Sequence, residues 1–166
     1  PGSVNSSPLV GPLVINEVMY HPASGYDEFV EIYNLGASPV ALYDPAFPTN
    51  GWKLNGLGHT FSNSVTLGAG QYPLLVNIDP AVFRAKYGVA SAVPILGPYA
   101  GNLQDSGERL RLQRPDSPDT NGVPYIVVDE VRYNDRLPWP PGADGDGPSA
   151  AGSEARARVR GAGPRL

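Results

Sequence analysis

Residues 108–133 have the sequence ERLRLQRPDSPDTNGVPYIVVDEVRY, and this stretch decides the fold class. In residues 108–114, leucines alternate with charged and amide side chains, which is the period of a strand with one buried face and one solvent face. Within residues 115–124, Asn121-Gly122 is a strong signal for a hairpin turn. Residues 125–133 are then the returning strand. The stretch therefore predicts an antiparallel hairpin that covers a hydrophobic core.

Similar short apolar segments occupy the first half of the chain. The alternation in Leu13–Tyr20 changes in the middle of the segment, which a β-bulge at Asn16-Glu17 would explain. In residues 29–35, Val30 and Ile32 share one face of a strand. The other strand candidates are residues 40–42, which a proline-rich insert at 44–50 separates from their continuation at 52–54, followed by residues 61–67 and 71–77.

One short helix is predicted over residues 80–87. Asp79 is a suitable N-cap, and Gly88 is well placed to end the helix. Phe83 and Tyr87 are four residues apart and lie on one face of it. Elsewhere, the 20 glycines and 19 prolines disfavour long helices and favour many turns. The pattern predicts an all-β sandwich of about seven or eight short strands with this one helix.

Length and composition are those of a single globular domain. The chain has 166 residues, 41% of them apolar, and a mean hydropathy of −0.22. No apolar run approaches the roughly 20 residues of a membrane span, so none is expected. Because the chain has no cysteine, a disulfide framework, thiol catalysis and cysteine-based zinc sites are excluded.

The net charge of −4 is unevenly distributed along the chain. Residues 1–83 contain six acidic residues and one basic residue, Lys53, whereas residues 84–166 contain eleven basic and ten acidic residues. Four of those basic residues are arginines that follow residue 155. Only this tail has a local positive field, and it has no aromatic residue to stack on bases. We therefore expect a protein or cell-surface partner rather than a nucleic acid.

The expected domain covers residues 12–148. Residues 1–11 lack the basic start and long apolar run of a secretory signal, and we interpret them as a linker or an expression remnant. Strand signals stop after Trp139, and residues 149–166 are predicted to be a disordered tail rich in arginine, alanine and glycine. If a last strand is missing there, the exposed sheet edge would favour self-association.

Taken together, these segments resemble one family, the lamin tail domain as it occurs in bacterial secreted and surface proteins. The resemblance covers about residues 13–147, and its pieces follow the family's order. The matching pieces are Ile15-Asn16-Glu17-Val18, residues 28–34, Val40-x-Leu42, Trp52-x-Leu54, Thr66-Leu67 before Gly68 and Gly70, residues 106–112, Val128-Asp129-x-Val131-x-Tyr133 and Pro138-Trp139-Pro140.

The resemblance implies an immunoglobulin-like sandwich that carries no catalytic residues. It implies a binding or architectural module within a larger extracellular or cell-envelope protein, and hence a secreted or envelope location. It assigns no cofactor and identifies no particular partner.

The main candidate site consists of four acidic residues, Glu17, Asp27, Glu28 and Glu31. If the first two strands pair, Glu17 and Glu31 would lie close together. Two neighbouring carboxylates can bind Ca²⁺ or act as an acid–base pair, so a hydrolase that uses them is one alternative function. The other interpretation is that Asp27 and Glu28 are solvated loop residues. Arg109 or Arg132 would then pair with a strand carboxylate.

Two loops carry oxygen side chains at a spacing similar to that of calcium ligands: Asp116, Asp119 and Asn121 in the first, Asp144 and Asp146 in the second. The first loop lacks the bidentate glutamate of an EF-hand. Both loops also fit ordinary turns, in which Asp and Asn side chains bond their own backbone. No cofactor is therefore assigned, and a calcium-stabilised adhesion or carbohydrate-binding module is the other alternative function.

The remaining chemistry is sparse. The chain's two histidines, His21 and His59, fall in turns, and no Gly-x-Ser-x-Gly motif accompanies them, so no serine-hydrolase triad is expected. Aromatic residues available for a sugar platform are Tyr20, Tyr26, Tyr43, Tyr99, Tyr125, Tyr133 and Trp139. Packing in the core is their favoured role, and Trp52 is assigned to the core as well. The sequence thus predicts a non-catalytic binding module and not an enzyme.

Overall fold

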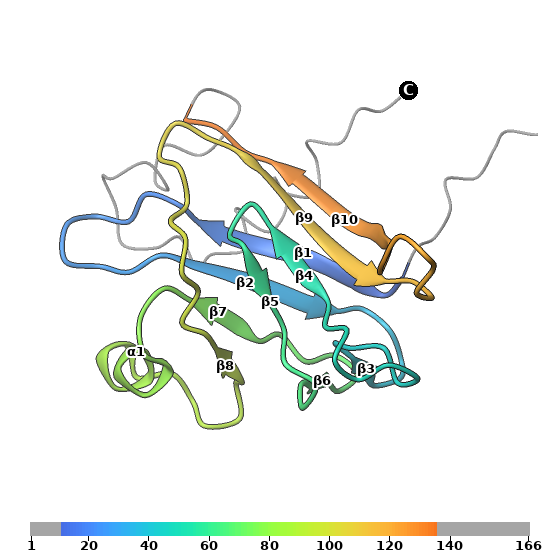
Figure 1. The fold of residues 1–166 in the computed structure, drawn as a ribbon. Coiled ribbons are helices and arrows are strands. Elements are labelled where there is room, and N and C mark those ends of the chain that lie inside the picture. The colour runs from blue at the N-terminus through green and yellow to red at the C-terminus, as the bar shows by residue number, and fades with distance from the viewer. Residues whose placement is uncertain (1–10, 136–166) are drawn as a thin grey trace, which may run out of the picture.

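The computed structural model describes residues 11–135, which form ten β-strands and one helix (Figure 1). The first sheet has the order β1-β2-β7-β8 and comprises β1 (Leu13–Met19), β2 (Phe29–Asn34), β7 (Leu74–Val76) and β8 (Ile95–Leu96). The second sheet has the order β10-β9-β4-β5 and comprises β10 (Tyr125–Arg132), β9 (Arg109–Pro115), β4 (Lys53–Asn55) and β5 (His59–Thr60). A two-stranded ladder joins β3 (Val40–Ala41) to β6 (Thr66–Leu67), and α1 (Pro80–Tyr87) follows β7.

The main hydrophobic core is built from the inner faces of the two four-stranded sheets. Val30 and Ile32 of β2 are fully buried in it, as are Leu110 and Leu112 of β9. Trp52, which precedes β4, belongs to the same cluster. Each such side chain contributes roughly 1.5–3 kcal/mol when it is removed from water. The predicted all-β sandwich with one short helix is confirmed.

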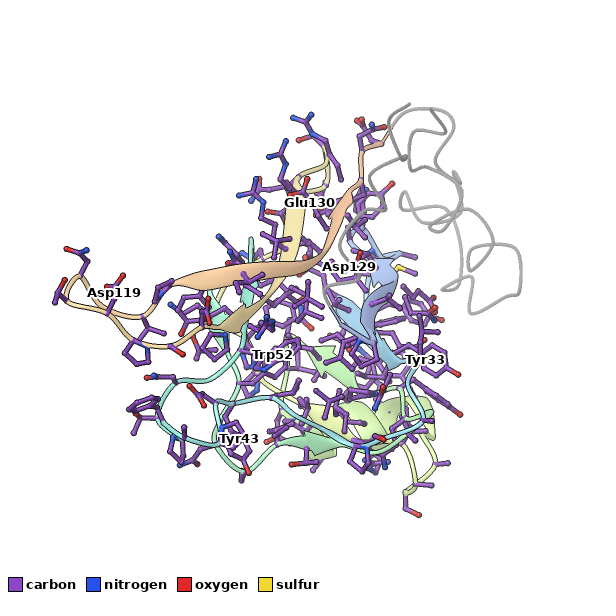
Figure 2. The ribbon with its side chains drawn as sticks, turned by 90° about the vertical axis from the view of Figure 1, so that its right-hand side faces the viewer. Tyr33, Tyr43, Trp52, Asp119, Asp129 and Glu130 are labelled. Carbon is purple, nitrogen blue, oxygen red and sulfur yellow. The ribbon has the colours of Figure 1, made fainter. Side chains whose placement is uncertain are left out.

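Two β-bulges meet where the sheets approach each other along β1 and β10. The register of β1 shifts between Ile15 and Glu17, as predicted, and that of β10 shifts between Val127 and Asp129. The Ile15 N–H donates a hydrogen bond of 2.7 Å to the Asp129 carboxylate, and Figure 2 shows Asp129 where β10 passes β1. Burial raises the pKa of Asp129, and the N–H groups of Ile15 and Glu130 oppose that rise.

Helix α1 begins and ends at the predicted residues. The Asp79 side chain accepts hydrogen bonds from the N–H groups of Ala81 and Val82, which caps the first turn. Gly88 ends the helix with φ 60°, in the left-handed region that glycine tolerates best. Phe83 packs in a second apolar cluster with Met19, Phe29 and Val76, so the helix covers part of the outer face of the first sheet.

The prediction of a single strand at residues 61–67 was wrong. The chain turns at residues 62–65, where the Val65 N–H bonds the Ser62 carbonyl. The flanking residues enter different ladders, β5 in the second sheet and β6 against β3. A short polar run is compatible with a strand by itself, and the turn is selected because it lets Phe61 and Leu67 both reach the core.

The predicted continuation of residues 40–42 at residues 52–54 was also wrong. Tyr43 and Gly51 form an antiparallel bridge, so the chain reverses across the proline-rich insert. As a result, β3 and β4 belong to different ladders. Strand β8 was not among the predicted strands, and it pairs in parallel with β7 through Leu74 and Ile95.

Some predictions fall on residues outside the described range of 11–135. These are the role of Trp139, the second candidate calcium loop at Asp144 and Asp146, the linker before residue 11, and the tail at 149–166. The limits of the domain at residues 12 and 148 therefore stay predictions.

The hydrogen bond between the two bulges generates the first prediction. Asp129→Ala leaves the Ile15 N–H without its acceptor and should lower the free energy of unfolding by about 1–3 kcal/mol. Asp129→Asn keeps an acceptor oxygen and should cost less. Urea unfolding of the two variants at neutral pH measures the difference, and equal losses would show that the hydrogen bond contributes little.

The raised pKa of Asp129 generates a second prediction. Since the folded chain protonates this carboxylate at a higher pH than the unfolded chain does, protonation favours the folded state. Between about pH 7 and pH 4, the wild-type free energy of unfolding should therefore rise relative to that of Asp129→Asn. A difference that is constant or moves in the opposite direction would contradict the burial of this charge.

Candidate functional site

The outer face of the first sheet contains a pocket of about 310 Å³ beside α1. Strands β1, β2 and β7 form its floor, and the helix and the loop before β2 form its walls. It brings together three of the four acidic candidates, Glu17, Asp27 and Glu31, with apolar and aromatic side chains. This combination of a concave apolar surface with a few polar groups is typical of binding sites.

Strands β1 and β2 do pair, and Glu17 and Glu31 lie directly opposite each other on them. Each side chain is about 6% exposed. The side-chain amide of Asn16, the bulged residue, donates a hydrogen bond of 2.5 Å to Glu31 Oε1. Carboxylates that face each other across a ladder destabilise a sheet when nothing offsets their repulsion. The pocket floor thus concentrates negative charge in an environment with little water.

Asp27 is held at the pocket wall by α1. Its carboxylate Oδ2 accepts hydrogen bonds from Lys86 Nζ at 2.6 Å and from the Tyr87 hydroxyl at 2.9 Å. The same hydroxyl accepts the Asp27 N–H at 2.8 Å. Burial and the bond to Asp27 raise the pKa of Tyr87, and the bond to Asp27 raises the pKa of Lys86. The charge of Asp27 is therefore offset by the Lys86 ammonium.

Glu28 is separated from the other three acidic candidates. Its carboxylate accepts hydrogen bonds from the Tyr99 hydroxyl at 3.0 Å and from the Leu103 N–H at 3.1 Å. Burial is the main cause that raises the pKa of Tyr99, and the Glu28 charge adds to it. The interpretation of Asp27 and Glu28 as solvated loop residues was therefore wrong, since both are half-buried and bond distant segments.

Aromatic side chains of α1 and of the loop before β2 form one wall of the pocket. The rings of Phe83 and Tyr87 are 4.5 Å apart, and those of Tyr26 and Tyr87 are 6.2 Å apart. Tyr26 is 52% exposed and stands at the rim. Phe83 and Tyr87 were not among the predicted site residues, although their four-residue spacing indicated one helix face, and Tyr26 was a candidate only for a sugar platform. No pattern in the sequence indicated that this helix face would meet Glu17 and Glu31.

The predicted partner of a strand carboxylate is found on the second sheet. Arg109 lies 3.4 Å from Glu130, and Arg111 lies 2.6 Å from it. The bond to Arg111 lowers the pKa of Glu130, and the charges of all three arginines of this hairpin face act in the same direction.

Neither histidine lies at the pocket. His21 is 3.9 Å from Asp105, and the ring of His59 packs edge-on against Phe61 with 4.8 Å between centroids. Burial lowers the pKa of His59.

The described calcium candidates form ordinary turns. The Asp116 side chain accepts the Ser117 N–H, and the Asp119 side chain accepts the Asn121 N–H at 2.7 Å. Figure 2 shows Asp119 at the far end of the hairpin between β9 and β10. Within residues 11–135, no three acidic or histidine side chains converge on one point. Calcium binding stays a prediction, and unfolding temperatures with Ca²⁺ and with EDTA test it.

Most of the candidate sugar-platform residues that the structure describes are not exposed. Tyr20, Tyr99 and Tyr133 are buried, and the rings of Tyr20 and Tyr133 are 4.6 Å apart. Burial and the hydrogen bond to Glu108 raise the pKa of Tyr133. Tyr43 and Tyr125 line two other hollows, of about 310 and 390 Å³, at the edges of the second sheet.

The model of the Lamin Tail Domain family matches residues 6–134. The chain belongs to this family. The match covers both sheets, and it agrees with an immunoglobulin-like sandwich of a non-catalytic kind. No curated protein sequence matches this lamin tail domain. None of the helices in the described part of the chain is long and apolar enough to cross a membrane.

The tie between Asp27 and α1 generates a third prediction. Tyr87→Phe removes both hydrogen bonds to Asp27 and should lower the free energy of unfolding by about 1–3 kcal/mol. The matched control is Val82→Ala on the same helix. Val82 is 56% exposed, so the control should change the stability by less than about 0.5 kcal/mol. Urea unfolding checks both variants, and equal effects would mean that the bonds to Asp27 do not hold the helix.

Proposed function

We propose that this lamin tail domain is a non-catalytic binding module of a larger extracellular or cell-envelope protein, and that its pocket accepts a cationic side chain of a protein partner. The observation that supports this is the buried carboxylate of Glu31 on the floor of a pocket with aromatic walls. The extracellular setting rests on the resemblance to bacterial surface proteins.

The chemistry of the pocket favours a lysine or arginine side chain. The aliphatic stem of such a side chain would contact Met19, Phe29 and Leu74, and its charged end would reach the carboxylates. Charges attract each other more strongly in a site that excludes water than on an exposed surface. The exposed ring of Tyr26 offers an aromatic face, which attracts cations by about 0.5–2 kcal/mol. A neutral apolar side chain would gain only the contacts of its stem with the apolar residues of the pocket.

The proposed function is tested by titrating the ¹⁵N-labelled protein with N-acetyl-lysine amide and N-acetyl-arginine amide. Amide shifts should concentrate on β1, β2 and α1. N-acetyl-norleucine amide, which has a similar stem without the charge, should bind at least about tenfold more weakly, as expected for the loss of roughly 1.4 kcal/mol. Equal binding of the norleucine compound, or shifts elsewhere, would contradict the proposal.

Two variants separate binding from folding. Glu31→Gln keeps an acceptor for Asn16 but removes one charge, and it should weaken the binding of both cations about tenfold. Tyr26→Ala removes an exposed ring at the rim, so it should weaken binding with little change in the unfolding temperature. Full affinity in both variants would overturn the assignment of this pocket.

A further inference from the structure

Among residues 11–135, three arginines surround one glutamate on the outer face of the β9–β10 hairpin. Arg109 lies opposite Arg132, and Arg111 lies opposite Glu130. Both Arg109 and Arg111 contact the Glu130 carboxylate. Figure 2 shows Glu130 and Trp52 on opposite sides of this hairpin, so the cluster faces away from the core. One carboxylate offsets only part of the charge of three guanidinium groups.

The opposed pair Arg109 and Arg132 is the most positive part of this face. Like charges directly across a ladder destabilise a sheet, so nothing in the folding of the hairpin itself favours this pairing. Both residues are exposed. Each guanidinium has five N–H donors in a planar fork, which is the geometry that carboxylates bind best. The pair therefore presents two guanidinium groups side by side to an anionic group.

The same face continues with an apolar residue and a further cation. Val127 is 37% exposed and lies opposite Gln113, whose neighbour on β4 is Lys53. The Lys53 ammonium lies 3.8 Å above the centre of the Tyr125 ring. Arginines, an exposed valine and a lysine thus follow one another along the outer face of β10, β9 and β4.

We infer that this face binds an extended, acidic segment of a protein partner that alternates carboxylate and apolar side chains. Residues two apart on an extended chain are about 6.6–6.8 Å apart, the same spacing as that along β9 and β10. Carboxylates of the segment would pair with the arginines as Glu130 does, and an apolar side chain would cover Val127. This inference concerns a second surface and does not depend on the pocket under α1.

An acidic segment fits this face better than a nucleic acid does. The chain has a net charge of −4, which repels a long polyanion such as a nucleic acid. A short acidic segment on this face feels little of that repulsion, because charges farther away than the Debye length of about 8 Å are largely screened. The face also lacks an open aromatic ring for base stacking, because Lys53 covers Tyr125.

The test uses fluorescence anisotropy with a labelled eight-residue peptide that alternates glutamate and valine. The peptide in which glutamine replaces glutamate and a labelled DNA oligonucleotide of equal length are the comparison probes. The glutamate peptide should bind most tightly, and its affinity should fall as salt is added. Equal binding of the glutamine peptide, or tighter binding of DNA, would overturn the inference.

Matched variants locate the site. Arg109→Gln and Arg132→Gln should each weaken binding of the glutamate peptide about fivefold. Arg114→Gln removes the same charge from the opposite face of β9, beside Trp52, and should change it less than about twofold. A loss with Arg114→Gln as large as that with Arg109→Gln would overturn the assignment of this face.

Glu130→Gln gives a test in which the expected result is tighter binding, which a misfolded variant would not show. Removing the one carboxylate of the cluster leaves three arginines without competition, so the glutamate peptide should bind a few-fold more tightly. Unchanged or weaker binding would contradict the inference. Glu31→Gln in the pocket should leave the peptide affinity unchanged, which keeps a failure here distinct from a failure of the proposed pocket.

Discussion

The bulge at Asn16 is the constraint on which both the sandwich and its candidate site depend. A bulge adds one residue to a strand and so changes which side chains face the core. Ile15 therefore faces inward before the bulge, and Glu17 faces outward after it, opposite Glu31. The bulge also directs the Asn16 amide to Glu31 and leaves the Ile15 N–H to bond Asp129. One extra residue thus links the two sheets and builds the floor of the pocket.

The two sheets expose outer faces of opposite character. The first sheet presents buried carboxylates beneath α1, whereas the second presents arginines along its hairpin. Their inner faces are mainly apolar, and the buried amide of Asn34 there is hydrogen-bonded to backbone carbonyls. A sandwich of this kind can change its outer faces with little effect on its core, which is why one immunoglobulin-like fold supports many binding roles.

Much of the fold was predictable because its signals are local. The alternation of β2 and β9, the Asn-Gly turn and the caps of α1 each depend on residues within a few positions of one another. The failures have a different origin. Short polar runs such as residues 62–65 are compatible with a strand or a turn, and β8 is only two residues long. The structure of these segments depends on contacts with residues far away in the sequence, and no local sequence pattern indicates those contacts.

The sequence alone determined the sandwich class and the helix at residues 80–87, because each follows from the period of a strand or a helix. The proximity of Glu17 to Glu31 depended on the pairing of β1 with β2, which the folded chain supplies. The tertiary structure decided which acidic residues share a site. Glu28 bonds Tyr99 on one side of the chain, and Asp27 bonds Tyr87 on the other. These two residues are adjacent, but successive side chains of extended chain point in opposite directions. What each one meets depends on packing, which only the folded chain specifies.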